Sequence, residues 1–343
     1  MNPPRRPART DQQPSPAPVV GVIDIGTNSV KLTVGRVSRG RVAIVHVARE
    51  TTRLGEGMTR TGRISTEAGT RTARVVRRMA GEARARGAHE VLAIGTFALR
   101  RATNGRRVAR AIARTAGVEV RVLSGVAEAR CSLAAVRARL DRPRPWLIVV
   151  DIGGGSTELI VARGTTVHTV RSLPIGALRL TERHLHTDPI APGEHAAMMR
   201  EINDTVARVF ARIPRIPPAS SQLVAVGGSA TTALRMIRGV AIGFYAGGLV
   251  TRAELRGLET RCLELDLAGR RRLPGLPADR ADIIPAGLAV LIAFARRTRK
   301  RSLIVSEGGV REGVILARSE PRARDRARTR SRARPAPARP TGR

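Results

Sequence analysis

Residues 147–160 read LIVVDIGGGSTELI, and this stretch decides the fold class. The apolar run before Asp151 predicts a strand buried on both faces, with the aspartate at its end. The backbone N–H groups of Gly153–Gly155 can approach another group closely and form a concave anion site, to which Ser156 and Thr157 add hydroxyl donors. We expect Asp151 to hold a divalent metal ion, or water beside one, rather than to touch phosphate. The alternative is a glycine-rich hairpin with aspartate at its turn.

The same design appears in residues 19–29, which read VVGVIDIGTNS. An apolar run again ends in an aspartate, Asp24, which glycine and hydroxyl residues follow. The two aspartates are 127 residues apart, about the length of one domain. Two such turns at this distance indicate a duplicated domain that holds a phosphate chain between its two copies.

Composition narrows the class of partner. The chain has 343 residues, enough for two domains, and 42% of them are hydrophobic, enough for a core. Aromatic residues make up only 2%, which disfavours modules that stack bases on aromatic rings. The net charge is +35, and Lys31 and Lys300 are the only lysines. A GC-rich genome explains the preference for arginine, whereas the excess of positive charge predicts attraction of a polyanion: polyphosphate, a nucleotide, nucleic acid or an acidic membrane.

The cysteines and the chain ends predict a cytoplasmic protein. Cys131 and Cys262 are the only cysteines and have no metal-ligand or disulfide pattern. Residues 1–18 are rich in Pro and Arg and predict a disordered leader rather than a signal peptide. No apolar run is as long as a membrane span, so we expect no membrane partner. Residues 318–343 hold ten arginines and two acids, which indicates a solvated tail shaped by codon bias or, alternatively, one that captures polyphosphate or nucleic acid non-specifically.

Strands and helices are predicted to alternate along the rest of the chain. Helices are expected over residues 65–86, 106–116, 125–140, 194–213, 252–263 and 286–296, and strands over 30–37, 41–47, 90–95, 118–123, 159–162, 167–173, 223–226 and 303–305. A third glycine–hydroxyl turn, with Gly228 and Ser229, follows the strand at 223–226. The last strand is expected to lead into a turn over 306–313 and then into a final helix that ends near residue 318.

Several short segments in a fixed order carry a family resemblance. In chain order they are DIGTNS at 24–29, RLGEG at 53–57, Gly95-Thr96 with Leu99-Arg100 and Asn104-Gly105, Ser124-Gly125 with Glu128-Ala129-Arg130, residues 151–158, Gly227-Gly228-Ser229, and Arg311-Glu312-Gly313. Together they resemble the exopolyphosphatase / guanosine pentaphosphate phosphohydrolase family over roughly residues 19–317. The two Asp–Gly turns alone would fit the wider actin-like superfamily, whereas the Ser-Gly…Glu-Ala-Arg and Arg-Glu-Gly segments are more specific.

The resemblance implies an α/β fold of two actin-like, ribonuclease-H-fold domains, at residues 19–130 and 131–317, with the active site in the cleft between them. It implies hydrolysis of the terminal phosphoanhydride of inorganic polyphosphate, of guanosine pentaphosphate or of both, with Mg²⁺ or Mn²⁺ as cofactor. The family's catalytic glutamate is the second of a Glu-Glu pair, here Glu128, and Ala127 replaces the first. The chain is expected to be a short form without the HD-like C-terminal domain of longer members, and a homodimer is common in the family.

The residue chemistry and the resemblance give each site residue an expected role. Glu128 would deprotonate the attacking water, and the planar guanidinium of Arg100 would stabilise the transition-state charge. Asp151 and Glu158, with Asp24, would hold the metal ion, mostly through water. The residues expected to bind phosphate are Gly26, Thr27, Asn28, Ser29, Gly153, Gly154, Gly155, Ser156, Gly228 and Ser229. The alternatives are a helix-dipole role for Glu128 and a plain surface role for Arg100.

Other functions remain open on the sequence. The enzyme could prefer guanosine pentaphosphate, although no guanine pocket is evident. It could be an actin-like ATPase or kinase, because the turn at 227–229 stands where that superfamily holds adenosine. It could also be a non-catalytic polyanion-binding protein. The retained acids Glu128, Asp151 and Glu158 argue against this last alternative, because carboxylates beside phosphates do not help a pure binder.

Overall fold

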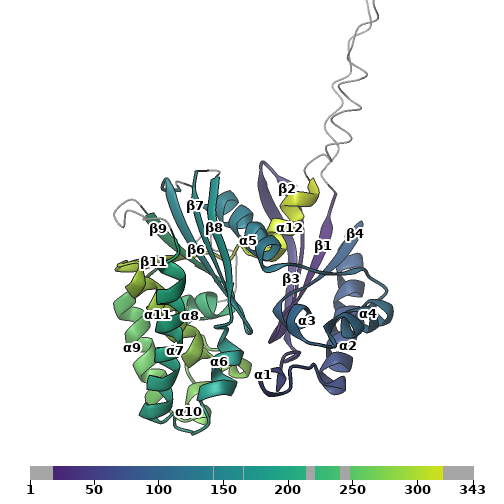
Figure 1. The fold of residues 1–343 in the computed structure, drawn as a ribbon. Helices are drawn as coiled ribbons and strands as arrows, with labels where there is room; N and C mark the ends of the chain where they lie inside the picture. The colour runs from purple at the N-terminus through teal and green to yellow at the C-terminus, as the bar shows by residue number, and fades with distance from the viewer. Residues whose placement is uncertain (1–17, 142, 165, 214–220, 240–247, 320–343) are drawn as a thin grey trace, which may run out of the picture.

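Two β-sheets form the centres of two lobes (Figure 1). The structure, a computed structural model, describes residues 18–141, 143–164, 166–213, 221–239 and 248–319, so most of the predicted leader and basic tail lie outside it. The first lobe holds β1 (Val20–Ile25), β2 (Ser29–Ser38), β3 (Arg41–Thr51), β4 (Glu90–Gly95) and β5 (Val120–Val122). The second holds β6 (Trp146–Ile152), β7 (Thr157–Arg163), β8 (Thr166–Leu173), β9 (Ser221–Val226), β10 (Gly248–Thr251) and β11 (Ser302–Val305).

The two sheets repeat one topology. The first has the strand order β3-β2-β1-β4-β5, in which β1 runs antiparallel to β2 and parallel to β4. The second has the order β10-β11-β9-β6-β7-β8, in which β6 runs antiparallel to β7 and parallel to β9. Read from β8, this is the same order with β10 added at the edge. The predicted duplication and the actin-like α/β fold class are confirmed.

The register of the sheets places the two aspartates in equivalent positions. Asp24 on β1 pairs with Lys31 on β2, and Asp151 on β6 pairs with Glu158 on β7. Both partners follow their aspartate by seven residues, so the repeat of 127 residues holds for the strand pairs as well as for the turns. Cross-strand partners share a face of the sheet. Asp24 therefore has a neighbour of opposite charge, Lys31, and Asp151 has a neighbour of like charge, Glu158.

Helices bury apolar faces on each sheet. In the first lobe these are α2 (Thr66–Ala85), α3 (Phe97–Arg101) and α4 (Gly105–Ala116), near the short α1 (Met58–Thr61). In the second lobe they are α6 (Ala177–His184), α7 (Pro192–Phe210), α8 (Gly228–Arg238), α9 (Arg252–Glu264), α10 (Leu267–Arg271) and α11 (Ile284–Arg297), with the 3₁₀ turn η2 (Ala278–Arg280). Side chains cap two of these helices: Ser65 accepts from the N–H of Ala68 at the start of α2, and Thr251 forms a capping box with Glu254 at the start of α9. None of the described helices has both the length and the hydropathy that a membrane crossing requires.

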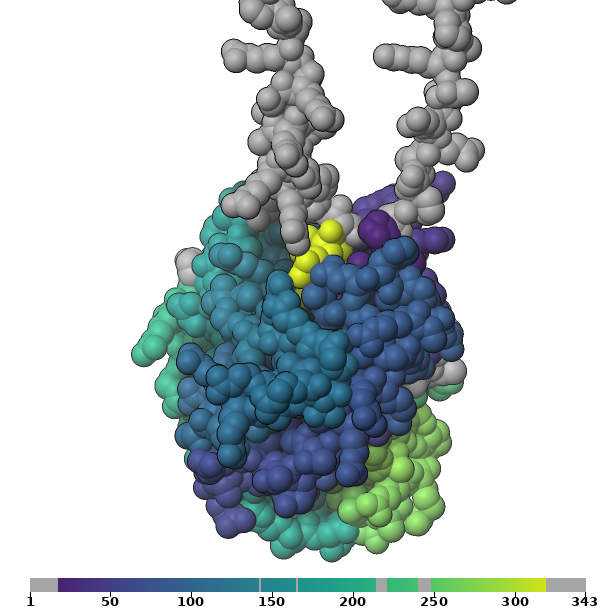
Figure 2. All heavy atoms as spheres, turned by 90° about the vertical axis from the view of Figure 1, so that its right-hand side faces the viewer, coloured from purple at the N-terminus to yellow at the C-terminus, as the bar shows by residue number. Residues whose placement is uncertain are grey.

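Two helices connect the lobes. Helix α5 (Gly125–Arg139) packs on β6, β7 and β8 of the second sheet and also contacts β3. Helix α12 (Val310–Ser319) follows the second sheet in the chain but packs on β1 and β2 of the first sheet, and along α5. In Figure 2 its yellow atoms reach the surface beside purple atoms of the first lobe. The limits predicted for the two domains, at residues 130 and 131, stay a prediction, because these helices contact both sheets.

The last helix begins earlier than predicted. The expected turn over 306–313 ends at Gly309, and Val310–Gly313 form the first turn of α12. Gly313, expected in the turn, lies in the helix, and its missing side chain admits the backbone of α5. A Cβ atom there would lie 2.0 Å from the carbonyl oxygen of Cys131.

Candidate active site

A cavity of about 370 Å³ lies between the lobes, where β1 and β6 end. Most of the predicted site residues line it: Asp24, Gly26, Thr27, Asn28, Ser29, Glu128, Asp151, Gly153, Gly154, Gly155, Ser156 and Gly228. Arg100, Glu158 and Ser229 are not among the residues that line it. The duplicated turns therefore meet at one site, as the duplication predicts.

The two turns have the same hydrogen-bonded geometry. The N–H of Gly26 donates to the carbonyl oxygen of Ser29 at 3.1 Å, and that of Gly153 donates to Ser156 at 2.9 Å. A Cβ atom on Gly26 would lie 2.8 Å from the same oxygen of Ser29, so the turn requires glycine. Because these two N–H groups close the turns, we expect backbone donors to an anion from the neighbouring residues, and the assignment of Gly26 and Gly153 to the phosphate site stays a prediction.

The turns also touch each other. A Cβ atom on Gly154 would lie 3.1 Å from the backbone nitrogen of Asn28, and one on Gly155 would lie 2.2 Å from the ring of Phe97. These glycines are needed for contact between the lobes as well as for any approach of a ligand. The position of one glycine turn therefore fixes the position of the other.

N–H groups of flanking segments donate to the carbonyl oxygens of both turns. Gly55, from the RLGEG segment at 53–57, donates its N–H to the carbonyl oxygen of Thr27 at 2.9 Å, and the N–H of Arg53 donates to that of Asn28 at 2.8 Å. In the second lobe the N–H groups at the start of α6 do the same, since Ala177 donates to Gly153 and Arg179 donates to Gly154, each at 3.0 Å. The turns are thus rigid walls of the cavity.

Asp24 and Asp151 form an acid pair with unequal surroundings. Oδ2 of Asp151 accepts a hydrogen bond from the Ser132 hydroxyl at 2.6 Å. Oδ1 of Asp24 is buried and has no hydrogen-bond partner among the residues that the structure describes. Burial raises the pKa of both carboxyls, and the nearby cations Lys31 and Arg311 oppose this rise.

This pair fits a magnesium ion better than it fits a metal ion whose ligands all come from the protein. No three His, Cys, Asp or Glu side chains come together as a metal site within the described ranges. Mg²⁺ commonly takes one or two carboxylates and fills its remaining positions with water and substrate phosphates. The unpaired buried oxygen of Asp24 and the neighbouring Asp151 provide such a partial ligand set.

Glu158 lies elsewhere than expected. Its side chain is almost fully buried, and Oε1 accepts from the hydroxyls of Ser156 at 2.8 Å and of Ser172 at 2.6 Å. Burial, and to a smaller extent Asp151, raises its pKa to about 7. Since it does not line the cavity, the structure gives no support to the predicted role of Glu158 as a metal ligand.

Arg100 pairs with carboxylates rather than facing the cavity. Its Nη1 donates to Oε2 of Glu128 at 3.0 Å and to the carbonyl oxygen of Leu123 at 2.8 Å, and its Nη2 lies 3.8 Å from Oε1 of Glu158. The guanidinium also lies over the ring of Phe97. This side chain is thus no free surface arginine. It is placed to orient Glu128 and is not among the residues that line the cavity, so its predicted contact with phosphate stays a prediction.

Glu128 is buried on the cavity wall, in the first turn of α5. The helix-dipole alternative loses support, because Ser124 caps the helix by accepting from the N–H of Ala127, and Glu128 pairs with Arg100 instead. Burial is the main cause that raises its pKa well above the ordinary value, and the charges of Glu158 and Asp151 add to it. A carboxylate with a raised pKa that faces a cavity is suited to act as a general base.

Five cationic side chains that the sequence did not single out as site residues line the same cavity: Lys31, Arg49, Arg235, Arg280 and Arg311. Burial lowers the pKa of Lys31 to about 8, even though Asp24 opposes this. Arg311, from α12, donates to the carbonyl of Leu32 at 3.0 Å and to the hydroxyl of Thr33 at 2.7 Å. The signal for Lys31 was its place seven residues after Asp24, which mirrors Glu158 after Asp151.

An arginine covers the third glycine turn. Gly227 has φ +93°, and a Cβ atom on Gly228 would lie 2.6 Å from Nη1 of Arg280. Nη2 of Arg280 donates to the buried hydroxyl of Ser229 at 3.5 Å. Arg280 thus separates Ser229 from the cavity, and Arg280 itself lines the cavity. A guanidinium beside this turn suits an anion, and the adenosine site of the kinase alternative is not favoured.

Comparisons with known proteins identify the family. The family model described as the Ppx/GppA phosphatase family matches residues 33–321. An uncharacterized protein of Streptomyces coelicolor is 32% identical over 87% of this chain and 90% of its own, and exopolyphosphatase 2 of Mycobacterium tuberculosis is 30% identical over 87% and 98%. The crystal structure of the Aquifex aeolicus member of the Ppx/GppA family is 29% identical, with a TM-score of 0.73, over 88% and 98%. The chain therefore belongs to the Ppx/GppA phosphatase family.

Proposed function

We propose that the protein is an exopolyphosphatase, a metal-dependent hydrolase that releases orthophosphate from the end of inorganic polyphosphate. The observation that carries the proposal is the buried carboxylate of Glu128 on the wall of a cavity that also holds two glycine turns and five cations. The relative named exopolyphosphatase 2 in Mycobacterium tuberculosis supports the same substrate.

The walls of the cavity supply the charge and donors that a terminal phosphoryl group needs. Both polar atoms of the Asn28 amide are buried without a hydrogen-bond partner in the described part of the chain, so its N–H donors are available to a ligand. Lys31 and Arg311 add positive charge beside the acid pair. Hydrolysis of a phosphoanhydride depends mainly on such positioning and charge.

Asp24 and Asp151 would hold a magnesium ion, or manganese in its place, largely through water. The ion would neutralise charge on the phosphate oxygens during the reaction. Every other part of the proposed mechanism lies in the chain itself.

Glu128 is the proposed general base. Arg100 holds Oε2, and we assign the attacking water to Oε1, the other carboxylate oxygen. The water loses its proton to Glu128 as its oxygen attacks the terminal phosphorus, and the bridging oxygen leaves with the shortened chain. Arg100 orients the base, while Lys31 and Arg311 stabilise the negative charge on the phosphate oxygens.

A second candidate function is hydrolysis of guanosine pentaphosphate. Four apolar residues, Ile44, Val47, Pro277 and Ile283, are also among those that line the cavity, and a base could lie against them. One preparation assayed for magnesium-dependent phosphate release from long polyphosphate, tripolyphosphate and guanosine pentaphosphate decides between them. We expect the highest kcat/KM for a polyphosphate. A higher value for guanosine pentaphosphate would reverse the ranking, and binding without phosphate release would end both proposals.

A further inference from the structure

A line of cations runs from the acid pair to the solvent. Lys31 interacts electrostatically with Asp24 at one end and with Arg280 at the other, and Arg280 interacts in turn with Arg49 and Arg235. Arg280 is buried, whereas the side chain of Arg49 is 30% exposed. The Nε atoms of Arg235 and Arg280 are buried and lack a hydrogen-bond partner among the described residues. Buried donors of this kind need partners, and phosphate oxygens would provide them.

An aspartate lies at the outer end of this line. Arg49 donates to Oδ2 of Asp279 at 2.9 Å, the hydroxyl of Thr51 donates to the same oxygen, and the Asp279 side chain is 40% exposed. Arg49 and Thr51 belong to β3 in the first lobe, and Asp279 belongs to η2 in the second. We call the Arg49–Asp279 ion pair the rim pair. It places a negative charge beside Arg49, which lines the cavity and is partly exposed, and it connects the two lobes.

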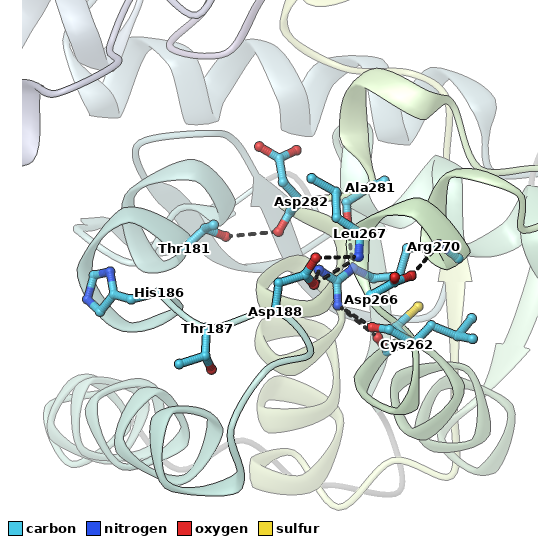
Figure 3. Close-up of polar contacts among 12 residues, drawn as sticks. Thr181, His186, Thr187, Asp188, Cys262, Asp266, Leu267, Arg270, Ala281 and Asp282 are labelled. Atoms are coloured by element: carbon cyan, nitrogen blue, oxygen red, sulfur yellow. Dashed lines mark hydrogen bonds and ion pairs between the residues drawn. The ribbon is translucent and has the colours of Figure 1, made fainter.

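The segment that carries Asp279 is anchored firmly in the second lobe. The guanidinium of Arg270 donates to the carbonyls of Ala281 at 3.1 Å and Leu265 at 2.7 Å, and to Asp188 at 3.0 Å (Figure 3). Arg270 itself is 4% exposed, so these contacts are shielded from water. Asp279 is therefore a fixed charge at the rim rather than the tip of a loose loop.

We propose that the rim pair sets the chain-length preference of the enzyme, an inference that rests on the proposed exopolyphosphatase function. A short polyphosphate fits within the cavity and ends before the rim. A long polyphosphate must leave the cavity past Asp279, which repels its phosphates and competes with them for Arg49. The rim pair thus weakens the binding of long chains relative to short ones.

The test compares two isosteric variants. Asp279→Asn removes the negative charge and frees Arg49 from its ion pair. Glu182→Gln is the matched control, because Glu182 also connects the lobes, by accepting from the N–H of Gly57 at 3.0 Å and the hydroxyl of Thr59 at 2.9 Å, but it neither lines the cavity nor acts on Arg280. KM is measured for long-chain polyphosphate and for tripolyphosphate at low salt, and the readout is the ratio of the two values.

We expect Asp279→Asn to lower the ratio of KM for the long chain to KM for tripolyphosphate by about tenfold, since one nearby like charge is removed. The effect should shrink at high salt, because the rim is exposed. Glu182→Gln should keep the wild-type ratio. Hydrolysis of both substrates with an unchanged ratio in Asp279→Asn would overturn the inference, as would an equal fall in both variants, which would assign the effect to loosened lobes. A wild-type protein that hydrolyses neither substrate would instead refute the proposed function, so the two failures are distinct.

Discussion

At the scale of single residues, two glutamates, Glu158 and Glu128, have different expected roles because their side chains have different neighbours. Glu158 is enclosed by the hydroxyls of Ser156 and Ser172, away from the cavity. Glu128 lies on the cavity wall with one oxygen held by Arg100. Only the second arrangement leaves a carboxylate oriented and close to a substrate, which is the requirement for a general base.

Replacing Glu128 by Gln should separate binding from catalysis. The amide keeps the size of the side chain but cannot take a proton from water, so kcat should fall by roughly two or more orders of magnitude. Binding of polyphosphate, measured by calorimetry, should persist. Glu119→Gln is a suitable control, because Glu119 is exposed and pairs only locally with Arg121. Turnover of Glu128→Gln close to that of the wild type would remove Glu128 from the role of base.

The raised pKa of Glu128 predicts the acid side of the pH profile. A general base works only when deprotonated, so kcat/KM should fall as the pH drops through a pKa well above the ordinary 4.5. The Arg100 charge counteracts this rise, so Arg100→Met should move the acid limb further toward high pH. The measurement is kcat/KM against pH for both proteins. An acid limb at or below pH 4.5 in the wild type would contradict this assignment.

Some of these residues could be predicted from sequence and others could not. Glu128 and Asp151 stand in distinctive local patterns, and both line the cavity. Lys31 was open to prediction from the seven-residue spacing that it shares with Glu158. Arg235 and Arg280 carried no signal, because they are two among dozens of arginines, and only packing decides which of them are buried beside a cavity.

At the scale of elements, strong periodic patterns were predicted well and glycine-rich starts of helices were not. The helix predicted over 65–86 corresponds to α2, whose cap and apolar stripe are both explicit in the sequence. Helices α8 and α12 begin within or directly after glycine-rich segments, which locally favour turns. Tertiary contacts override that preference: Arg280 packs over Gly228, and Cys131 packs against Gly313.

The facing turns give a prediction at this scale. Valine at position 154 would press on Asn28, since even a Cβ atom would lie 3.0 Å from the Cβ of that residue. Gly154→Val should therefore push the turns apart and raise KM for polyphosphate by at least about tenfold. Gly193→Ala is the control, because a Cβ atom there would meet nothing within 4 Å. Unchanged KM in Gly154→Val would contradict the assignment of the turns as the phosphate site.

At the scale of the whole molecule, α12 joins the base to the other lobe. Glu312 forms a buried ion pair with Arg139 of α5, at 2.7 Å, while the neighbouring Arg311 reaches β2 in the first lobe. Gly313 lies against Cys131, which is one helical turn from Glu128 on the same α5. The position of the base relative to the turns of the first lobe thus depends on how closely α12 and α5 approach.

Gly313→Ala tests this dependence. A methyl group there would lie 2.0 Å from a backbone oxygen, which cannot rotate away, so the two helices must separate. We expect a loss of about 1–3 kcal/mol in the free energy of unfolding and a fall in kcat of at least about tenfold, because small displacements of a catalytic group are costly. Gly309→Ala, at the start of the same helix, would meet nothing within 4 Å and should change the stability by less than about 0.5 kcal/mol. Chemical denaturation and steady-state kinetics on both variants measure the two effects. If Gly313→Ala lost stability but kept the wild-type kcat under conditions where it is folded, α12 would only hold the lobes together and would not position Glu128.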